Sequence, residues 1–144
     1  MLSEEELYIM NVDALHDDLC RMGKSSDANF SEARGLKDCL TYDRNGIKFV
    51  VANGNGFSAF TFIIPRMKDP REKVWKIKKG TPLPQGVRLV KDLRQDHQGH
   101  YMLAPASDMP LAKYLGLLAE LASNPAYAVK LSPQEITTCP TTPH

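Results

Sequence analysis

Histidine is the side chain best suited to moving a proton near neutral pH, and the chain has four. His16 beside two aspartates, His97 in a polar stretch and terminal His144 are all predicted to face solvent. His100 differs, because it opens an apolar stretch and directly precedes Tyr101. A histidine at the end of a strand can donate a hydrogen bond or act as a general acid or base. A solvent-capped His100 remains the simpler interpretation of the sequence alone.

Other reactive side chains form no recognisable motif. The sequence has no Walker loop, GxGxxG, HExxH, GxSxG or paired CxxC. Cys20, Cys39 and Cys139 are odd in number and widely spaced, which argues against a disulfide framework and a zinc site. We expect no metal. Two of the cysteines lie in apolar helical patterns, where a free cysteine behaves as a small hydrophobic residue, and free cysteines are typical of the cytosol.

Length and composition predict one globular domain. The chain has 144 residues, is 42% hydrophobic and 24% charged, and carries a formal net charge of +1. A charge so near zero gives no reason to expect nucleic acid or a membrane as the partner. The acidic start of the chain does not resemble a secretory signal, so we expect action in the cytoplasm, with signal-independent secretion left open.

The first half of the sequence predicts a mixture of helices and strands. Residues 6–12 favour a strand, although Ser3 and Glu6 could instead open a helix as a capping box. Helical spacing predicts a helix from Asp13 to Met22, which Gly23 ends, and a second helix over residues 30–40. Strands at 47–52 and 57–64 are predicted to form a hairpin around the glycine-rich turn 53–56.

The second half predicts short strands and one long helix. Strands are expected at 74–77, 87–90 and 100–105, and a helix capped by Asp108 is expected to end before Asn124. Because helices and strands do not alternate regularly, we predict an α+β fold of mainly antiparallel, short-stranded sheets with flanking helices. Residues 1–131 form the predicted domain, and the Pro- and Thr-rich segment 132–144 is predicted to be a flexible tail.

One stretch of the sequence also resembles a known family. The motif Gly-Thr-Pro-Leu-Pro-Gln-Gly at 80–86 is followed by a strand ending in Lys91 and Asp92, then by His100-Tyr101 and an amphipathic helix. This order, over roughly residues 74–121, is similar to the C-terminal half of Tse-type type VI secretion effectors. These are small toxins with an ADP-ribosyltransferase-like fold. Leu7-Tyr8 and the segment 56–60 resemble N-terminal strands of the same family.

The resemblance implies a cleft that holds NAD as co-substrate. It gives Ser58 and His100 catalytic roles and assigns contacts with the cofactor to Tyr8, Phe60 and Tyr101. A cognate immunity protein is the implied partner.

Two departures from the family pattern leave a second function open. Residues 7–10 carry no arginine or histidine to hold NAD, and neither Glu120 nor Glu135 is placed as a catalytic glutamate. A non-catalytic, partner-binding or regulatory module on the same scaffold is therefore the alternative.

Overall fold

The structure is a computed structural model that describes residues 1–143, and its α+β class is the one that the sequence predicts. A seven-stranded sheet has the order β1-β7-β8-β5-β2-β6-β10, with the bounds Leu7–Met10, Val87–Asp92, His100–Pro105, Phe57–Phe60, Leu19–Gly23, Lys73–Ile77 and Ala128–Lys130. A smaller sheet consists of β3 (Thr41–Arg44), β4 (Ile47–Val50) and β9 (Met109–Pro110). The helices are α1 (Glu32–Asp38), α2 (Leu111–Ser123) and α3 (Pro133–Thr138), and the 3-10 turns are η1 (Glu4–Glu6) and η2 (Pro65–Lys68). Neighbouring strands in both sheets are antiparallel.

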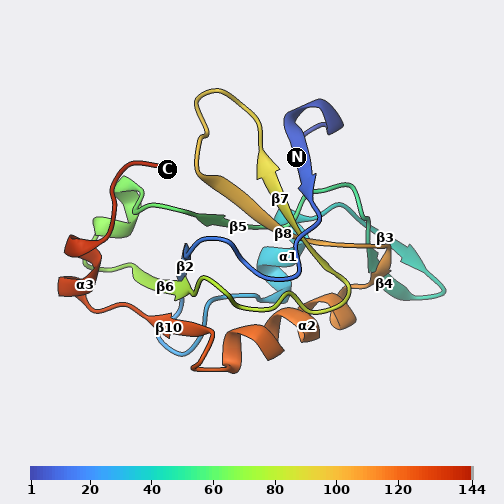
Figure 1. Cartoon of the computed structure of the whole chain (residues 1–144). Coiled ribbons are helices and arrows are strands. Elements are labelled where there is room, and N and C mark those ends of the chain that lie inside the picture. Colours follow the sequence, from blue (N-terminus) through green and yellow to red (C-terminus); the bar gives the residue numbers. More distant parts are fainter. Residues whose placement is uncertain (144) are drawn as a thin grey trace.

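The two faces of the large sheet are covered differently. Helix α2 lies along one face (Figure 1), where Phe57 of β5 packs against Tyr114 of the helix in the main core. The Tyr114 hydroxyl donates a hydrogen bond to the backbone oxygen of Leu103 in β8, which fastens the helix to the sheet. Two smaller clusters cover the other face: one is Val90, Met102 and Ala104, and the other is Cys20, Ile63, Met67, Val74 and Leu131.

The predicted helix from Asp13 to Met22 is wrong, because this stretch ends in strand β2. That strand lies inside the sheet and pairs with both β5 and β6. Its residues Leu19, Cys20 and Arg21 are consecutive and all buried. A strand covered on both faces lacks the alternation of apolar and polar residues that reveals a strand in sequence.

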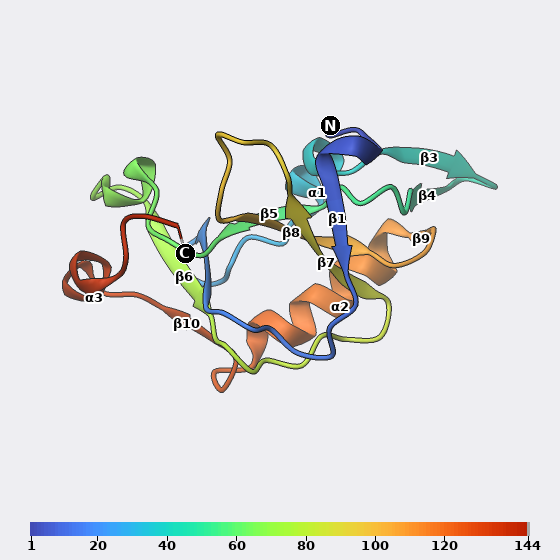
Figure 2. The ribbon, with the colours of Figure 1, turned by 45° about the horizontal axis from the view of Figure 1, so that its top comes forward.

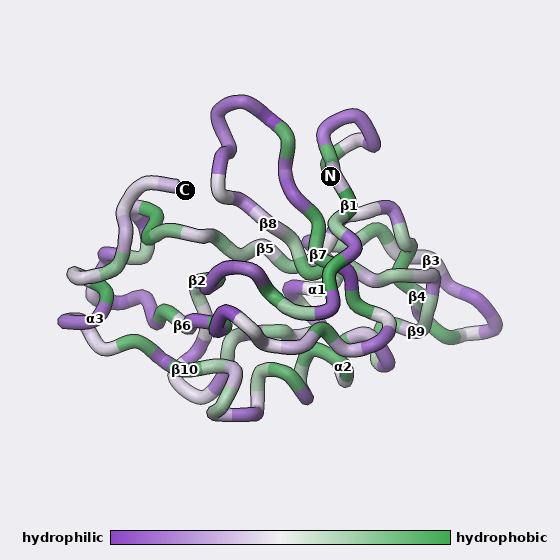
Figure 3. Tube along the Cα trace, in the orientation of Figure 1, coloured by the Kyte–Doolittle hydropathy of each residue, from purple (hydrophilic) through white to green (hydrophobic). Residues whose placement is uncertain are grey.

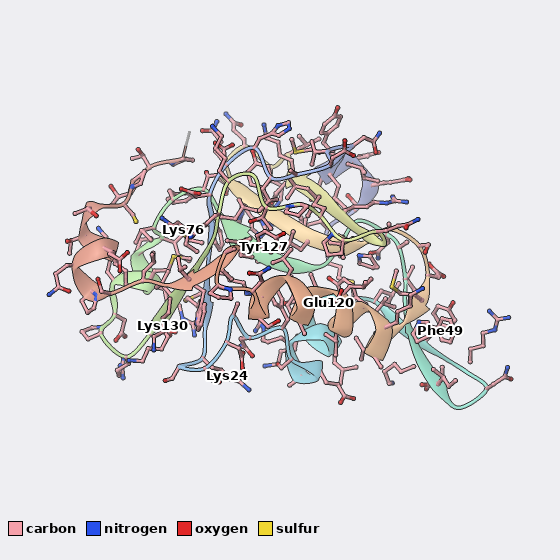
Figure 4. The ribbon with its side chains drawn as sticks, turned by 60° about the horizontal axis from the view of Figure 1, so that its bottom comes forward. Lys24, Phe49, Lys76, Glu120, Tyr127 and Lys130 are labelled. Atoms are coloured by element: carbon pink, nitrogen blue, oxygen red, sulfur yellow. The ribbon has the colours of Figure 1, made fainter. Side chains whose placement is uncertain are left out.

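The predicted hairpin between residues 47–52 and 57–64 is also wrong. The turn that makes a hairpin is Asn45-Gly46, whose φ angles of 51° and 79° suit a tight two-residue loop between β3 and β4. This hairpin, which carries Phe49, extends away from the main body (Figures 2 and 4). Residues 51–56 instead connect one sheet to the other, since β5 pairs with β2 and β8. Strand β3 is largely exposed and has no apolar alternation, so its sequence gives little sign of it.

The predictions for the second half are largely confirmed by β6, β7, β8 and α2. Asp108 does not cap α2, however, because its carboxylate accepts hydrogen bonds from Ala52 N (2.8 Å) and the Tyr42 hydroxyl (3.1 Å). Within the segment 132–144, α3 begins with a capping box of Ser132 and Glu135. The flexibility of that segment and the single-domain assignment stay predictions, and His144 lies outside the described residues. No helix within residues 1–143 is long and apolar enough to cross a bilayer.

Replacing Gly56 by alanine is expected to destabilise the fold by about 3 kcal/mol. An added Cβ would lie 2.2 Å from Leu103 O and 2.7 Å from Ala104 Cα, both in the backbone of β8, so two paired strands would have to separate. Urea unfolding measures the effect. Gly116→Ala in α2 is the control, because its Cβ would meet nothing within 4 Å and should stabilise the helix by about 0.5–1 kcal/mol. Equal unfolding midpoints for the two variants would contradict the prediction.

Candidate active site

Three polar side chains form a hydrogen-bonded chain on the face of the large sheet that α2 leaves free. His100, the first residue of β8, places its Nε2 atom 2.8 Å from the Ser58 hydroxyl oxygen on β5. Its Nδ1 atom lies 2.7 Å from a carboxylate oxygen of Asp92, the last residue of β7. Asp92 and His100 are buried, at 2% and 9% exposure. Ser58 and His100, which the sequence singles out, therefore meet, and Asp92 joins them.

A turn at the end of β7 holds the Asp92 carboxylate in place. Arg94, two residues later, donates to it through three nitrogens. Its backbone N bonds Oδ1 at 3.0 Å, its Nε bonds Oδ1 at 3.1 Å and Oδ2 at 3.3 Å, and a terminal guanidinium nitrogen bonds Oδ2 at 2.8 Å. Burial raises the pKa of Asp92, but the hydrogen bonds from Arg94 and His100 outweigh it and hold that pKa well below its usual range. Asp92 is thus a carboxylate at neutral pH.

The charge on Asp92 determines which nitrogen of a neutral His100 carries the proton. A carboxylate can only accept hydrogen bonds, so Nδ1 carries the proton and donates it to Asp92. Nε2 is then left with its lone pair facing Ser58, whose hydroxyl donates to it. The arrangement of carboxylate, imidazole and hydroxyl is the one that enzymes use to draw a proton from a serine.

Phe60 contacts the same histidine. Its ring is stacked on the His100 imidazole with the centroids 5.0 Å apart and the planes inclined by 28°. Phe60 and His100 are cross-strand partners in the register of β5 and β8, so the stack fixes the plane of the imidazole. The structure therefore places the predicted aromatic residue Phe60 in the site, where it borders a cavity together with Ser58.

Tyr8 and Tyr101, the other predicted cofactor contacts, lie on the opposite face of the sheet. Lys91 is the cross-strand partner of both tyrosines, and directly paired residues point to the same face. Tyr101 follows His100 immediately in β8, so the two point to opposite faces. Tyr8 is 57% exposed, whereas Tyr101 borders a small apolar cavity with Leu15 and Leu19. The structure does not bring these tyrosines together with Ser58, and their role stays a prediction.

Ser58 borders two cavities. The larger, of about 350 Å³, also contains His100, Arg94 and Lys37 in its wall. The smaller, of about 170 Å³, is lined by Phe60 and Arg66 among others. A cavity of about 620 Å³, larger than these two, lies between η2 and α3 and includes neither Ser58 nor His100 in its wall. Because the Ser58 hydroxyl is polarised by His100, we regard the two cavities beside it as the candidate site.

Each of these two cavities has one carboxylate and several basic groups in its wall. In the larger, Asp38 is paired with Arg34 at 3.0 Å, and in the smaller, Glu72 is paired with Arg66 at 3.2 Å. The sequence did not single out either acidic residue. Asp38 ends the short helix α1, and Glu72 lies in the polar connection before β6, which the sequence predicts to be exposed. The glutamates that the sequence raises lie elsewhere: Glu120 is exposed on α2 (Figure 4).

Glu135, the second of them, serves the C-terminal segment. Its carboxylate accepts a hydrogen bond from Ser132 N at 3.0 Å and completes the capping box of α3. The carboxylates that share a cavity wall with Ser58 are Asp38 and Glu72.

Arg21 braces the backbone beside Ser58. Its guanidinium donates to the backbone oxygens of Ser58 (2.6 Å), Ala28 (2.6 Å) and Asn29 (3.2 Å). It lies over the rings of Phe30 and Phe57, at 4.6 and 5.2 Å from their centroids. Burial lowers its pKa to about 10, which leaves it charged at neutral pH.

Arg21 comes from strand β2, which the sequence predicts as part of a helix. Strands β2 and β5 share one register pair, Cys20 with Phe60, and beyond it the guanidinium bonds the β5 backbone in place of a strand partner. Residues 7–10 in β1 lack a basic residue, and β5, which carries Ser58, pairs with β2 and β8 and not with β1. Arg21 was missed because its strand reads as a helix.

The sequence matches the family model described as "Tse2 ADP-ribosyltransferase toxin" over residues 16–126, more than three quarters of the chain. The match spans β2 to α2 and so includes Arg21, Ser58, Asp92 and His100, whereas β1 and α3 lie outside it. No curated protein and no solved structure shows significant similarity to the chain.

Proposed function

Because the chain belongs to the Tse2 ADP-ribosyltransferase toxin family, we propose that it transfers ADP-ribose from NAD at a site centred on Ser58 and His100. The observation that carries the proposal is the chain of hydrogen bonds from Asp92 through His100 to Ser58. It ends in a hydroxyl that borders two cavities, and it lies within the matched region.

The chemistry of NAD fits the groups around Ser58. The bond between C1′ of the nicotinamide ribose and the ring nitrogen breaks, and its electron pair leaves with nicotinamide. The positive charge that develops on the ribose is stabilised by a nearby carboxylate, for which Asp38 and Glu72 are the candidates. Lys37 and Arg34, in the walls of the two cavities, are the candidate partners of the negatively charged diphosphate.

The serine and histidine have a defined part in the second half of the reaction. A new bond forms between C1′ and an acceptor oxygen, which belongs to water or to a target molecule. The acceptor's proton passes to Ser58 while the Ser58 proton passes to Nε2 of His100. Asp92 stabilises the imidazolium that results, because its carboxylate stays hydrogen-bonded to Nδ1. Atoms and charge balance with nicotinamide, the modified acceptor and one proton as products, and His100 releases that proton to water.

In a cell, this activity would make the chain a growth-inhibiting toxin in a bacterial cytoplasm. Delivery by type VI secretion and neutralisation by a cognate immunity protein complete the proposal. Both follow the family and not a feature of the site.

The test is the release of nicotinamide from NAD by the purified chain, together with growth of bacteria that produce it. The wild-type chain is expected to release nicotinamide and to slow growth. Ser58→Ala is expected to lower the release by about two to three orders of magnitude and to restore growth. Ser123→Ala is the control, because that hydroxyl bonds Glu120 O at the end of α2 and should change neither. A soluble wild-type chain without turnover or growth effect would overturn the proposal and favour a partner-binding module.

A further inference from the structure

A second group of side chains meets where the loop after β7 leads into β8, the strand that His100 begins. Asp92, His97 and His100 each offer a ligand atom, and these atoms all lie within 4.8 Å of one another. Asp92 ends β7, His97 lies in the loop that follows, and His100 begins β8. We propose that these three residues bind a divalent transition-metal ion such as Zn²⁺, and that the bound ion inactivates Ser58.

The donor set suits zinc. Two imidazole nitrogens and one carboxylate oxygen are ligands that Zn²⁺ takes at about 2.0–2.2 Å, with water in a fourth position. Tetrahedral ligand atoms at those lengths stand about 3.3 Å apart. Nδ1 of His100 is 2.7 Å and Nδ1 of His97 is 4.0 Å from Oδ2 of Asp92. The first distance must widen and the second must shrink by less than 1 Å, and the two histidine nitrogens, which lie within 4.8 Å of each other, must approach by at most about 1.5 Å, so movement of the side chains suffices.

The backbone holds His97 near this position and leaves it open to solvent. His97 N donates to Arg94 O at 3.0 Å, and His100 N donates to His97 O at 3.2 Å, so two turns shape the loop. The loop between β7 and β8 is mostly hydrophilic and projects from the sheet (Figure 3). The His97 side chain is 41% exposed, which gives an ion access to the buried Asp92.

Arg94 occupies the place that the metal would take. One of its terminal nitrogens lies 2.8 Å from Oδ2 of Asp92 and 3.3 Å from Nδ1 of His97. The guanidinium is 34% exposed, so it can move toward solvent, while its Nε can keep its bond to Oδ1 of Asp92 at 3.1 Å. Arg94 therefore competes with the ion, and its removal should strengthen metal binding.

The bound ion would reverse the hydrogen bond to Ser58. A metal on Nδ1 of His100 displaces the proton from that nitrogen, so a neutral imidazole carries its proton on Nε2. Nε2 then donates to the Ser58 hydroxyl and no longer accepts its proton. Inhibition in this sense rests on the proposed function, whereas binding of the ion does not.

The binding test is a calorimetric titration of the metal-free chain, carrying no polyhistidine tag, with Zn²⁺. We expect one ion per chain, an affinity at least about tenfold weaker for His97→Ala, and a tighter one for Arg94→Gln. His16→Ala, an exposed histidine outside the cluster, should leave the affinity unchanged. Equal affinities of the wild-type chain and His97→Ala would overturn the proposal.

Nicotinamide release separates inhibition from binding. Saturating Zn²⁺ is expected to suppress the release by the wild-type chain but not by His97→Ala, whose activity without zinc should match the wild type. Binding without suppression would overturn the inhibitory role. A chain that releases no nicotinamide even without zinc would instead refute the proposed function, and the titration would still decide whether the metal site exists.

Discussion

Asp92→Asn is expected to lower nicotinamide release by about two to four orders of magnitude while the protein remains folded. The asparagine amide can donate to Nδ1 of His100, where the carboxylate can only accept. The imidazole would then hold its proton on Nε2 and donate it to Ser58, so the serine would lose the base that takes its proton. The measurement is turnover under saturating NAD, with circular dichroism to establish that the fold is native. A loss of less than fivefold would mean that the charge on Asp92 is not needed.

Asp69→Asn is a closely matched control for this variant. Asp69 makes the same local turn as Asp92, because Arg71 N donates to Oδ1 at 2.9 Å and the Arg71 guanidinium reaches Oδ1 at 3.1 Å and Oδ2 at 2.7 Å. The two Asp-x-Arg turns differ in that Asp92 also bonds His100. Asp69→Asn should therefore retain wild-type turnover. Equal losses in both variants would trace the effect to the turn and not to the histidine.

Arg21→Met is expected to lower the free energy of unfolding by about 3–5 kcal/mol, which is a large part of the stability of a small domain. Methionine fills much of the space but leaves the oxygens of Ser58, Ala28 and Asn29 without the donor that they share. Urea unfolding followed by tryptophan fluorescence measures the loss, since Trp75 lies on β6 opposite Arg21 in the register with β2.

Two further variants make this prediction specific. Arg34→Met removes an arginine that is 42% exposed and pairs with Asp38 one helical turn away, and should cost less than about 1 kcal/mol. Arg21→Lys keeps the charge and can reach some of the three oxygens, so we expect a smaller loss than for methionine. An Arg21→Met variant as stable as Arg34→Met would show that the buried guanidinium contributes little.

The sequence predicts secondary structure correctly where the residues of one segment carry a clear apolar pattern. The period of α2 and the short apolar runs of β6, β7 and β8 could be read directly. Strand β2 could not be predicted, because burial on both faces removes the alternation of apolar and polar residues. The place of Arg21 in that strand was therefore missed. The hairpin turn at Asn45-Gly46 was missed because the strand before it has little apolar character.

The site residues, in contrast, are brought together by pairing between strands that are far apart in the sequence. Resemblance brought forward Ser58 and His100, which are 42 positions apart and meet through the pairing of β5 with β8. The role of Asp92 depends on the register of β7 and on an arginine two residues later. No sequence motif specifies that register or the contact with that arginine. Tyr8 and Tyr101 were assigned through the same resemblance. The position of a residue along its strand decides which face its side chain takes, and this is known only once the register is known.

The wall of the larger cavity includes the first residues of the chain. The Asn55 side chain accepts a hydrogen bond from Leu2 N at 2.8 Å and donates one to Leu2 O at 3.0 Å, so it holds Leu2 as a neighbouring strand would. Met1 and Leu2 lie in the wall beside Ser58 and His100. A cleavable fusion partner attached at Met1 would therefore stand at the mouth of this cavity. If the chain inhibits growth as proposed, that geometry offers a route to producing it in bacteria: the fusion partner covers the cavity during expression, and a protease removes it after purification.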